Sequence, residues 1–167
     1  IEGKGSVFSF RIKVKVKHDE PVIDNRVEIG DVEYISFLRK NAQKYQCLVV
    51  EDNIGNQEVI TEVLNLINAT FEIVENGEDA VDAYLKERYD LVLMDIQMPV
   101  MDGLEATRQI RKISDSNNDP YIIALTANAF EEDVKRSIEA GMNIHVSKPI
   151  TFNDLIKPMY DFVKTLI

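Results

Sequence analysis

Apolar and polar positions follow two different periods along the chain. From Phe8 to Val16, apolar residues alternate strictly with polar ones. A period of two is typical of a half-buried antiparallel strand. From Tyr45 onward the pattern changes to short apolar runs without alternation, each followed by a segment with helical spacing. The pattern therefore predicts an N-terminal strand, a linker and an α/β body, at 1–17, 18–44 and 45–167.

The body contains five predicted strands and five predicted helices in alternation. The strands are expected at 46–51, 71–75, 91–95, 121–125 and 143–147. The helices are expected from 76 onward and at 54–68, 104–112, 129–140 and 151–166. Strands that alternate with helices form βαβ units, and uninterrupted apolar runs suit strands covered on both faces. The pattern therefore predicts an α/β fold, with a parallel sheet and helices on both of its faces.

The N-terminal strand and the linker raise the question of what covers them. The linker opens with turn-forming residues, and its later part has the spacing of a helix, which we expect at 31–44. The apolar face of the strand needs a cover, because an isolated strand is not stable in water. We expect this cover to be the linker helix or, in a homodimer, a second copy of the chain.

Charge divides the chain at the same place. Of a formal net charge of −10, residues 1–44 hold nine basic and seven acidic side chains, and residues 45–167 hold ten and twenty-two. So acidic a body repels nucleic acid and suits a metal cation. Cys47 stands alone, so an internal disulfide is excluded, and its apolar neighbours indicate core packing. No membrane span or signal peptide is recognisable, which predicts a cytoplasmic location without membrane contact.

Residues with reactive or metal-binding side chains stand where the predicted strands end. They are Glu51 and Asp52 after the first strand, Asp95 in the third, Thr126 in the fourth and Lys148 after the fifth. Parallel strands bring their carboxyl ends to one edge of the sheet, where ligands bind in open α/β folds. Converging carboxylates raise one another's pKa unless a cation lies among them. Mg²⁺ or Mn²⁺ would suit these oxygens and leave room for a phosphoryl oxygen, so Asp95 is a candidate nucleophile for phosphoryl transfer.

Four sequence motifs contain these residues. They are LVVEDN at 48–53, LVLMDIQMPVMDG at 91–103, ALTA at 124–127 and VSKP at 146–149. In this order and spacing they resemble the receiver domain of two-component response regulators. The resemblance covers 45–167 and implies the flavodoxin-like receiver fold, with five strands in the order 2-1-3-4-5. It also implies that the domain takes a phosphoryl group from a phosphohistidine with Mg²⁺ and relays it in signal transduction.

The resemblance implies roles for the acidic residues and their neighbour. Asp95 is the expected phosphoacceptor. The expected metal ligands are Asp95, Asp52, Glu51 through water, and the backbone carbonyl of Gln97. Gln97 also flanks the site, and we expect its side chain to tune the lifetime of the phosphoryl group.

The resemblance assigns a second group of residues to switching and lifetime. Thr126 is the expected switch hydroxyl, and Lys148 is the expected cation for the phosphoryl group. The peptide before Pro149 is expected to be cis. His145 stands at the aromatic switch position, where Tyr or Phe is commoner, and is expected to be a partly buried strand residue rather than a metal ligand. Asn128 is expected to tune the phosphoryl lifetime.

The stretch GKGSVFSFRI at 3–12 resembles the last glycine-rich box and final strand of the ATP-binding domain of histidine kinases. The other parts of that ATP site are missing, so ATP binding is not expected. Together the two resemblances imply a piece of a hybrid sensor histidine kinase with a receiver that catalyses its own phosphorylation and dephosphorylation. The implied partners are the phosphohistidine domain of the kinase core and a histidine phosphotransfer protein. The parent kinase can be membrane-anchored.

Two other functions stay open on the sequence. A phosphohydrolase with an aspartyl-phosphate intermediate needs a second acid two residues after the nucleophile, where this chain has Gln97. A stand-alone interaction module would keep the fold and signal without phosphorylation. Treatment with acetyl phosphate or beryllofluoride and Mg²⁺ would separate these functions: a receiver should gain one labile phosphoryl group, and Asp95→Asn none. Catalytic turnover of unrelated phosphoesters would favour the hydrolase.

Overall fold

The computed structural model describes residues 29–115, 119–127 and 130–167. The predicted N-terminal strand at 1–17, most of the predicted linker and Asn128 lie outside the described residues. The described part forms one parallel sheet in the order β2-β1-β3-β4-β5, so the predicted sheet and strand order are confirmed. The strands are β1 (Gln46–Val50), β2 (Thr70–Val74), β3 (Leu91–Asp95), β4 (Tyr121–Thr126) and β5 (Ile144–Ser147).

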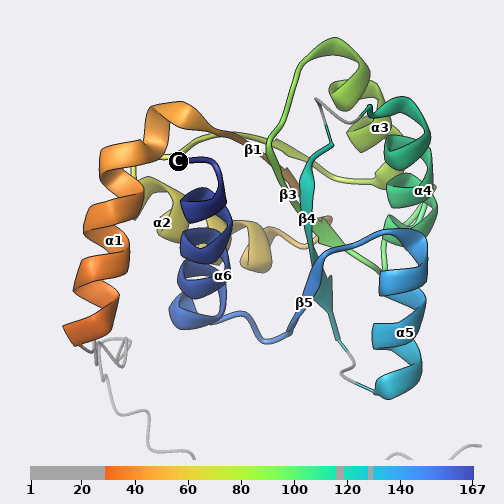
Figure 1. Ribbon diagram of the computed structural model, residues 1–167. Coiled ribbons are helices and arrows are strands. Elements are labelled where there is room, and N and C mark those ends of the chain that lie inside the picture. The colour runs from red at the N-terminus through yellow and green to blue at the C-terminus, as the bar shows by residue number, and fades with distance from the viewer. Residues whose placement is uncertain (1–28, 116–118, 128–129) are drawn as a thin grey trace, which may run out of the picture.

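Helices cover both faces of the sheet. They are α1 (Ile29–Asn41), the short 3₁₀-helix η1 (Ala42–Lys44), α2 (Ile54–Leu66), α3 (Gly77–Lys86), α4 (Gly103–Ile113), α5 (Glu131–Ala140) and α6 (Phe152–Thr165). Figure 1 shows α1, α2 and α6 on one side of the sheet and α3, α4 and α5 on the other. The predicted three-layer α/β architecture is therefore confirmed.

Alternating residues of the central strands feed the two layers of the core. In β3, Leu91 and Leu93 pack in the layer under α2 and α6, while Val92 and Met94 pack in the layer under α3 and α4. The same alternation places Cys47 in the core, as the sequence predicts. Because side chains point to opposite faces with a period of two, a strand covered on both sides must be apolar throughout. This is why the run that ends at Asp95 shows no polar alternation.

The register of the strands brings their carboxyl ends into line. Val50 of β1 pairs with Met94 of β3, so Glu51 and Asp95, the residues that follow, are neighbours. On the other side, Asp95 pairs with Leu125 of β4. Thr126 at the end of β4 then pairs with Ser147 of β5, immediately before Lys148.

The linker helix packs onto the α/β body. The predicted helix is present and begins two residues earlier than expected, at Ile29. Leu38 of α1 is fully buried in the core layer that it shares with α2 and α6. Tyr34 and Phe37 of α1 contact the ring of Tyr160 in α6, with ring centroids 4.5 and 4.9 Å apart. The helix therefore contributes to the core of the domain, and the predicted boundary at residue 45 stays a prediction.

Side-chain caps fix the first turns of the helices that follow the carboxyl edge of the sheet. Asn53 accepts a hydrogen bond from the backbone N–H of Asn56 at the start of α2. Asp102 caps α4 in the same way through the N–H of Glu105. Such caps satisfy backbone donors that a helix start leaves without partners. They hold the loops after β1 and β3 in defined positions, and these loops carry the candidate site.

Candidate functional site

The loop between β3 and α4 is held close to the end of the strand. The N–H of Ile96 donates a hydrogen bond to Leu125 O. The N–H of Gly103 donates one to Ile96 O at 3.0 Å. A Cβ on Gly103 would lie 2.0 Å from Asp95 O, a separation that real atoms do not reach. Only glycine therefore allows α4 to begin beside Asp95.

A lysine ammonium lies between two buried carboxylates at this edge. Lys148 Nζ donates a hydrogen bond of 2.6 Å to Asp95 Oδ2 and lies 2.7 Å from Glu51 Oε2. Glu51 and Asp95 are buried, and the Lys148 side chain is 16% exposed. The peptide between Lys148 and Pro149 is cis, as the sequence predicts.

The remaining carboxylate oxygens are only partly satisfied. Asp95 Oδ1 accepts from the N–H of Gln97 at 3.1 Å, and Glu51 Oε1 accepts from Asn53 N and Asn56 Nδ2. Glu51 Oε2 is buried, and its contact is the Lys148 ammonium at 2.7 Å. The one ammonium therefore serves both Glu51 and Asp95.

Burial and neighbouring charges shift the pKa of both members of the Asp95–Lys148 pair. Burial raises the pKa of Asp95, and the charge of Glu51 adds to this, against the lowering effect of Lys148 and the Gln97 N–H. Burial alone would lower the pKa of Lys148, but contact with Asp95 and Glu51 outweighs it and raises that pKa. Lys148 therefore stays charged at neutral pH, while the ionised form of Asp95 is less favourable than in water.

Three acidic residues at this edge can bind one metal ion. Glu51, Asp52 and Asp95 each offer one carboxylate oxygen, and these oxygens lie within 4.8 Å of one another. Together with the ammonium of Lys148, the three carboxylates have a formal net charge of −2. Hard divalent ions prefer carboxylate oxygens, and this set of three carboxylates fits such an ion.

A cleft gives solvent access to the acidic group. It has a volume of about 430 Å³, and its lining includes Asp52, Gln97 and Thr126. Thr126 is buried apart from this opening, and its carbonyl accepts the N–H of Lys148 at 2.7 Å. A small anion in the cleft would therefore reach the residues at the ends of β1, β3 and β4.

Most of the predicted site residues lie close together. Two differ from this: one is more exposed than predicted, and one lies outside the described residues. The structure brings five of the predicted residues together at the carboxyl edge, and their roles stay predictions: Glu51, Asp52, Asp95, Thr126 and Lys148. His145, in contrast, is exposed rather than partly buried, because β5 is the edge strand and pairs only with β4. The predicted lifetime residue Asn128 lies outside the described residues.

Sequence reasoning missed three residues of this site. Asn56 holds Glu51 through a 2.9 Å hydrogen bond from the first turn of α2, beyond the LVVEDN motif. Asp133 and Arg136 of α5 line the cleft. Their positions in α5 gave no signal, because charged residues in a helix are usually solvated. Only the packing of α5 beside the β3–α4 loop reveals their place.

The strand order and the strand-end carboxylates define a flavodoxin-like α/β domain with an acidic carboxyl edge. A family model for the response regulator receiver domain matches residues 47–159. The chain belongs to the response regulator receiver domain family, and the predicted membership is confirmed.

Individual relatives agree with this assignment. The osmosensing histidine protein kinase SLN1 of Saccharomyces cerevisiae is 42% identical over 117 residues, which cover 66% of this chain and 9% of the kinase. The receiver domain of a sensor histidine kinase from Pseudomonas aeruginosa, solved with a magnesium ion in its active site cleft, is 38% identical with a TM-score of 0.66. The match covers 72% of this chain and 98% of that domain.

A third similar structure contains a partner protein. It is the receiver domain of the Saccharomyces cerevisiae response regulator Ssk1, co-crystallised with the histidine phosphotransfer protein Ypd1. The TM-score is 0.69 at 28% identity, with 73% of this chain and 90% of that chain covered. The chain spans less than a tenth of the length of several histidine kinases that it matches. Two-component response regulators also match.

Proposed function

We propose that this receiver domain accepts a phosphoryl group on Asp95 with Mg²⁺ and passes it on in a two-component phosphorelay. The observation that carries the proposal is the buried Asp95 carboxylate, hydrogen-bonded to Lys148 within a group of three acids. A carboxylate can act as the nucleophile in phosphoryl transfer when nearby positive charge offsets the charge of the phosphoryl oxygens.

The residues of the edge would divide the work as follows. A carboxylate oxygen of Asp95 forms the new bond to phosphorus as the bond from phosphorus to the donor's histidine nitrogen breaks, and the electron pair leaves with that nitrogen. Lys148 and Thr126 hold phosphoryl oxygens. Asp52, Asp95, the Gln97 carbonyl and, through water, Glu51 would hold Mg²⁺, which would supply positive charge next to the phosphoryl group. Mn²⁺ is expected to substitute for it.

The rest of the parent protein is also proposed, from the relatives. Matches to hybrid histidine kinases support a hybrid kinase origin, with phosphohistidine in the kinase core as donor. The similar receiver bound to Ypd1 supports a histidine phosphotransfer protein as acceptor. The kinase remnant at 1–17 and a homodimer through its strand stay predictions.

Localisation follows the proposed parent. Within the described ranges, every helix is too short or too polar to cross a membrane. A cytoplasmic place for this domain, with a parent kinase that can be membrane-anchored, is part of the proposal.

Phosphorylation by acetyl phosphate tests the proposed chemistry. In the presence of Mg²⁺ we expect the wild type to gain one labile phosphoryl group by intact mass, and Asp95→Asn to gain none. Asp79→Asn is the matched control, because it makes the same charge change in the exposed first turn of α3. Uptake by Asp95→Asn, or steady turnover of unrelated phosphoesters, would contradict the proposal and favour a hydrolase.

Phosphorylation should also change the conformation of one side of the domain. We expect Thr126 to move toward the phosphoryl group and the change to spread over α5, β5 and α6, with His145 as the switch residue of β5. NMR shifts on addition of beryllofluoride and Mg²⁺ would report this spread. Shifts confined to α2 and α3 would contradict it, and no uptake at all would favour a module that signals without phosphorylation.

A further inference from the structure

The cleft lined by Asp52, Gln97 and Thr126 has an excess of negative charge. Its lining includes Asp52, Asp102 and Asp133, and the one cation among the described lining residues is Arg136. Beneath it, Lys148 is already shared by Glu51 and Asp95. A phosphoryl donor carries negative charge, so the acidic walls oppose its entry. The donor needs a cation at the cleft wall in addition to those at the bottom of the site.

Arg136 is placed to meet this need. It projects from the second turn of α5 and shares the cleft with Gln97 and Thr126. Its partner is Asp133, at 3.8 Å, with side chains 61% and 32% exposed. An ion pair this long and exposed contributes little, so the guanidinium can exchange Asp133 for another anion at small cost. The planar fork of arginine fits two oxygens of a phosphoryl group.

We propose that Arg136 receives the incoming phosphoryl donor, releasing Asp133 to bind the donor's phosphoryl oxygens before transfer to Asp95. This role rests on the proposed function. Arg136 acts on entry and positioning, and takes no part in bond exchange. With acetyl phosphate as donor, the Asp95 oxygen bonds to phosphorus, the bond from phosphorus to the acetyl oxygen breaks, and acetate leaves with the electron pair.

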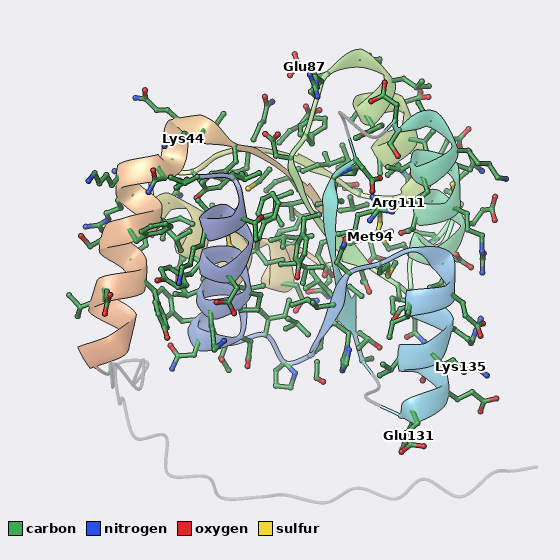
Figure 2. The ribbon with its side chains drawn as sticks, viewed as in Figure 1. Lys44, Glu87, Met94, Arg111, Glu131 and Lys135 are labelled. Carbon is green, nitrogen blue, oxygen red and sulfur yellow. The ribbon has the colours of Figure 1, made fainter. Side chains whose placement is uncertain are left out.

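The neighbouring residue Lys135 provides a matched control. It carries the same charge on the same helix, pairs with Glu139 at 3.8 Å, and is absent from the described lining of the cleft. Figure 2 labels Lys135 on the exposed part of α5. Arg136→Ala and Lys135→Ala therefore change the net charge equally and differ in whether the lost cation faces the cleft.

The experiment measures the rate of phosphorylation against acetyl phosphate concentration, with Mg²⁺ saturating. For Arg136→Ala we expect the half-saturating concentration to rise about tenfold at low salt, with the maximal rate little changed and the gap closing as salt is added. Lys135→Ala should behave as the wild type, and Arg136→Lys should recover part of the loss. Mg²⁺ affinity of Arg136→Ala should be equal to or tighter than wild type, because a nearby cation is removed.

Two results would overturn this role. Equal donor dependence in Arg136→Ala and Lys135→Ala would show that the cation in the cleft is not used. Weaker Mg²⁺ binding by Arg136→Ala would show that the substitution disturbs the acidic group instead. Failure of the wild type itself to take up phosphoryl would be a different result, since it would refute the proposed function and the role of Arg136 together.

Discussion

The amino and carboxyl edges of the sheet, where the parallel strands begin and end, differ in how fully their charged side chains are paired. At the amino edge, Arg111 lies at the end of α4 (Figure 2), and each of its guanidinium nitrogens donates a hydrogen bond. It donates to Gly141 O, Pro120 O, Asp119 Oδ1 and Asn143 Oδ1, at 2.6 to 2.9 Å. These contacts tie α4 to the segments that enter β4 and β5.

The carboxyl edge has too few cations for its acids. Lys148 contacts Glu51 and Asp95 there, and Asp52 adds a third carboxylate within 4.8 Å of theirs. The amino edge therefore satisfies its cation within the fold, whereas the carboxyl edge is under-neutralised, which supports the ligand site proposed there. Such local conflicts with stability are expected at functional sites.

The largest effect is expected from Gly103→Ala at the carboxyl edge. The added Cβ would meet Asp95 O at 2.0 Å, so the loop and the start of α4 must move. We expect a loss of about 4 kcal/mol or more in the free energy of unfolding, measured with urea. Gly55→Ala is the control, because its Cβ meets only the Asn53 side chain at 3.2 Å. A loss below about 1 kcal/mol for Gly103→Ala would contradict the close approach of the two segments.

A pair of substitutions separates the two edges directly. We expect Lys148→Ala to cost about 3 kcal/mol, because two buried carboxylates lose their cation. Arg111→Ala should cost about 2 to 3 kcal/mol through the acceptors that it leaves without a donor. Mg²⁺ should narrow the deficit of Lys148→Ala relative to wild type, and leave that of Arg111→Ala unchanged. Thermal unfolding of the two variants with and without Mg²⁺ measures these deficits. Equal responses of the two variants to Mg²⁺ would contradict the difference between the two edges.

Two tyrosines test how many buried polar groups at the amino edge have hydrogen-bond partners. The hydroxyl of Tyr45, before β1, is buried without a hydrogen bond from the described residues, whereas that of Tyr89, before β3, donates to Glu72. We expect Tyr45→Phe to raise the free energy of unfolding by about 1 kcal/mol and Tyr89→Phe to lower it by about 1 kcal/mol. Urea unfolding of both variants checks the signs, and a loss in Tyr45→Phe would mean that its hydroxyl has a partner.

The smallest effect concerns the charge of Asp95, because Lys148 offsets much of the cost of its burial. The pKa of Asp95 is raised in the folded domain. Its contribution to stability is therefore fully present below the unfolded pKa and is lost as pH rises through the folded pKa. At neutral pH we expect Asp95→Asn to be more stable than wild type without Mg²⁺, with the gap closing in acid. A variant less stable at neutral pH would contradict the sign.

The affinity for Mg²⁺ should also depend on the protonation of Asp95. In the proposed site Mg²⁺ would bind the ionised form of Asp95, so Mg²⁺ affinity should fall as pH falls through the raised pKa of that carboxyl. Isothermal titration at several pH values would measure this, with Asp79→Asn as control. Affinity unchanged down to the ordinary pKa range of an aspartate would contradict the raised value.

The sequence predicted the carboxyl edge well, because its residues stand directly after apolar runs. Asp95, Thr126 and Lys148 are located from the predicted ends of three strands. The amino edge could not be predicted in this way. Arg111 joins Asp119, Gly141 and Asn143, which come together only after two helices and two strands have packed.

The faces of α5 show a second limit of pattern reasoning. Phe130, Val134 and Ile138 share one face by spacing, yet Phe130 and Ile138 are exposed. The buried positions of the helix are Ser137 and Ala140, whose small side chains allow close packing. Periodicity identifies a face but does not say which neighbour covers it.

The most direct test identifies the residue that becomes phosphorylated. The domain is treated with acetyl phosphate and Mg²⁺, reduced with borohydride, which converts an aspartyl phosphate to homoserine, and mapped by peptide mass spectrometry. We expect homoserine at position 95 alone, in an amount that follows Mg²⁺ occupancy. Homoserine at another aspartate, or none with Mg²⁺ bound, would contradict the claim that the under-neutralised edge is built for phosphoryl transfer to Asp95.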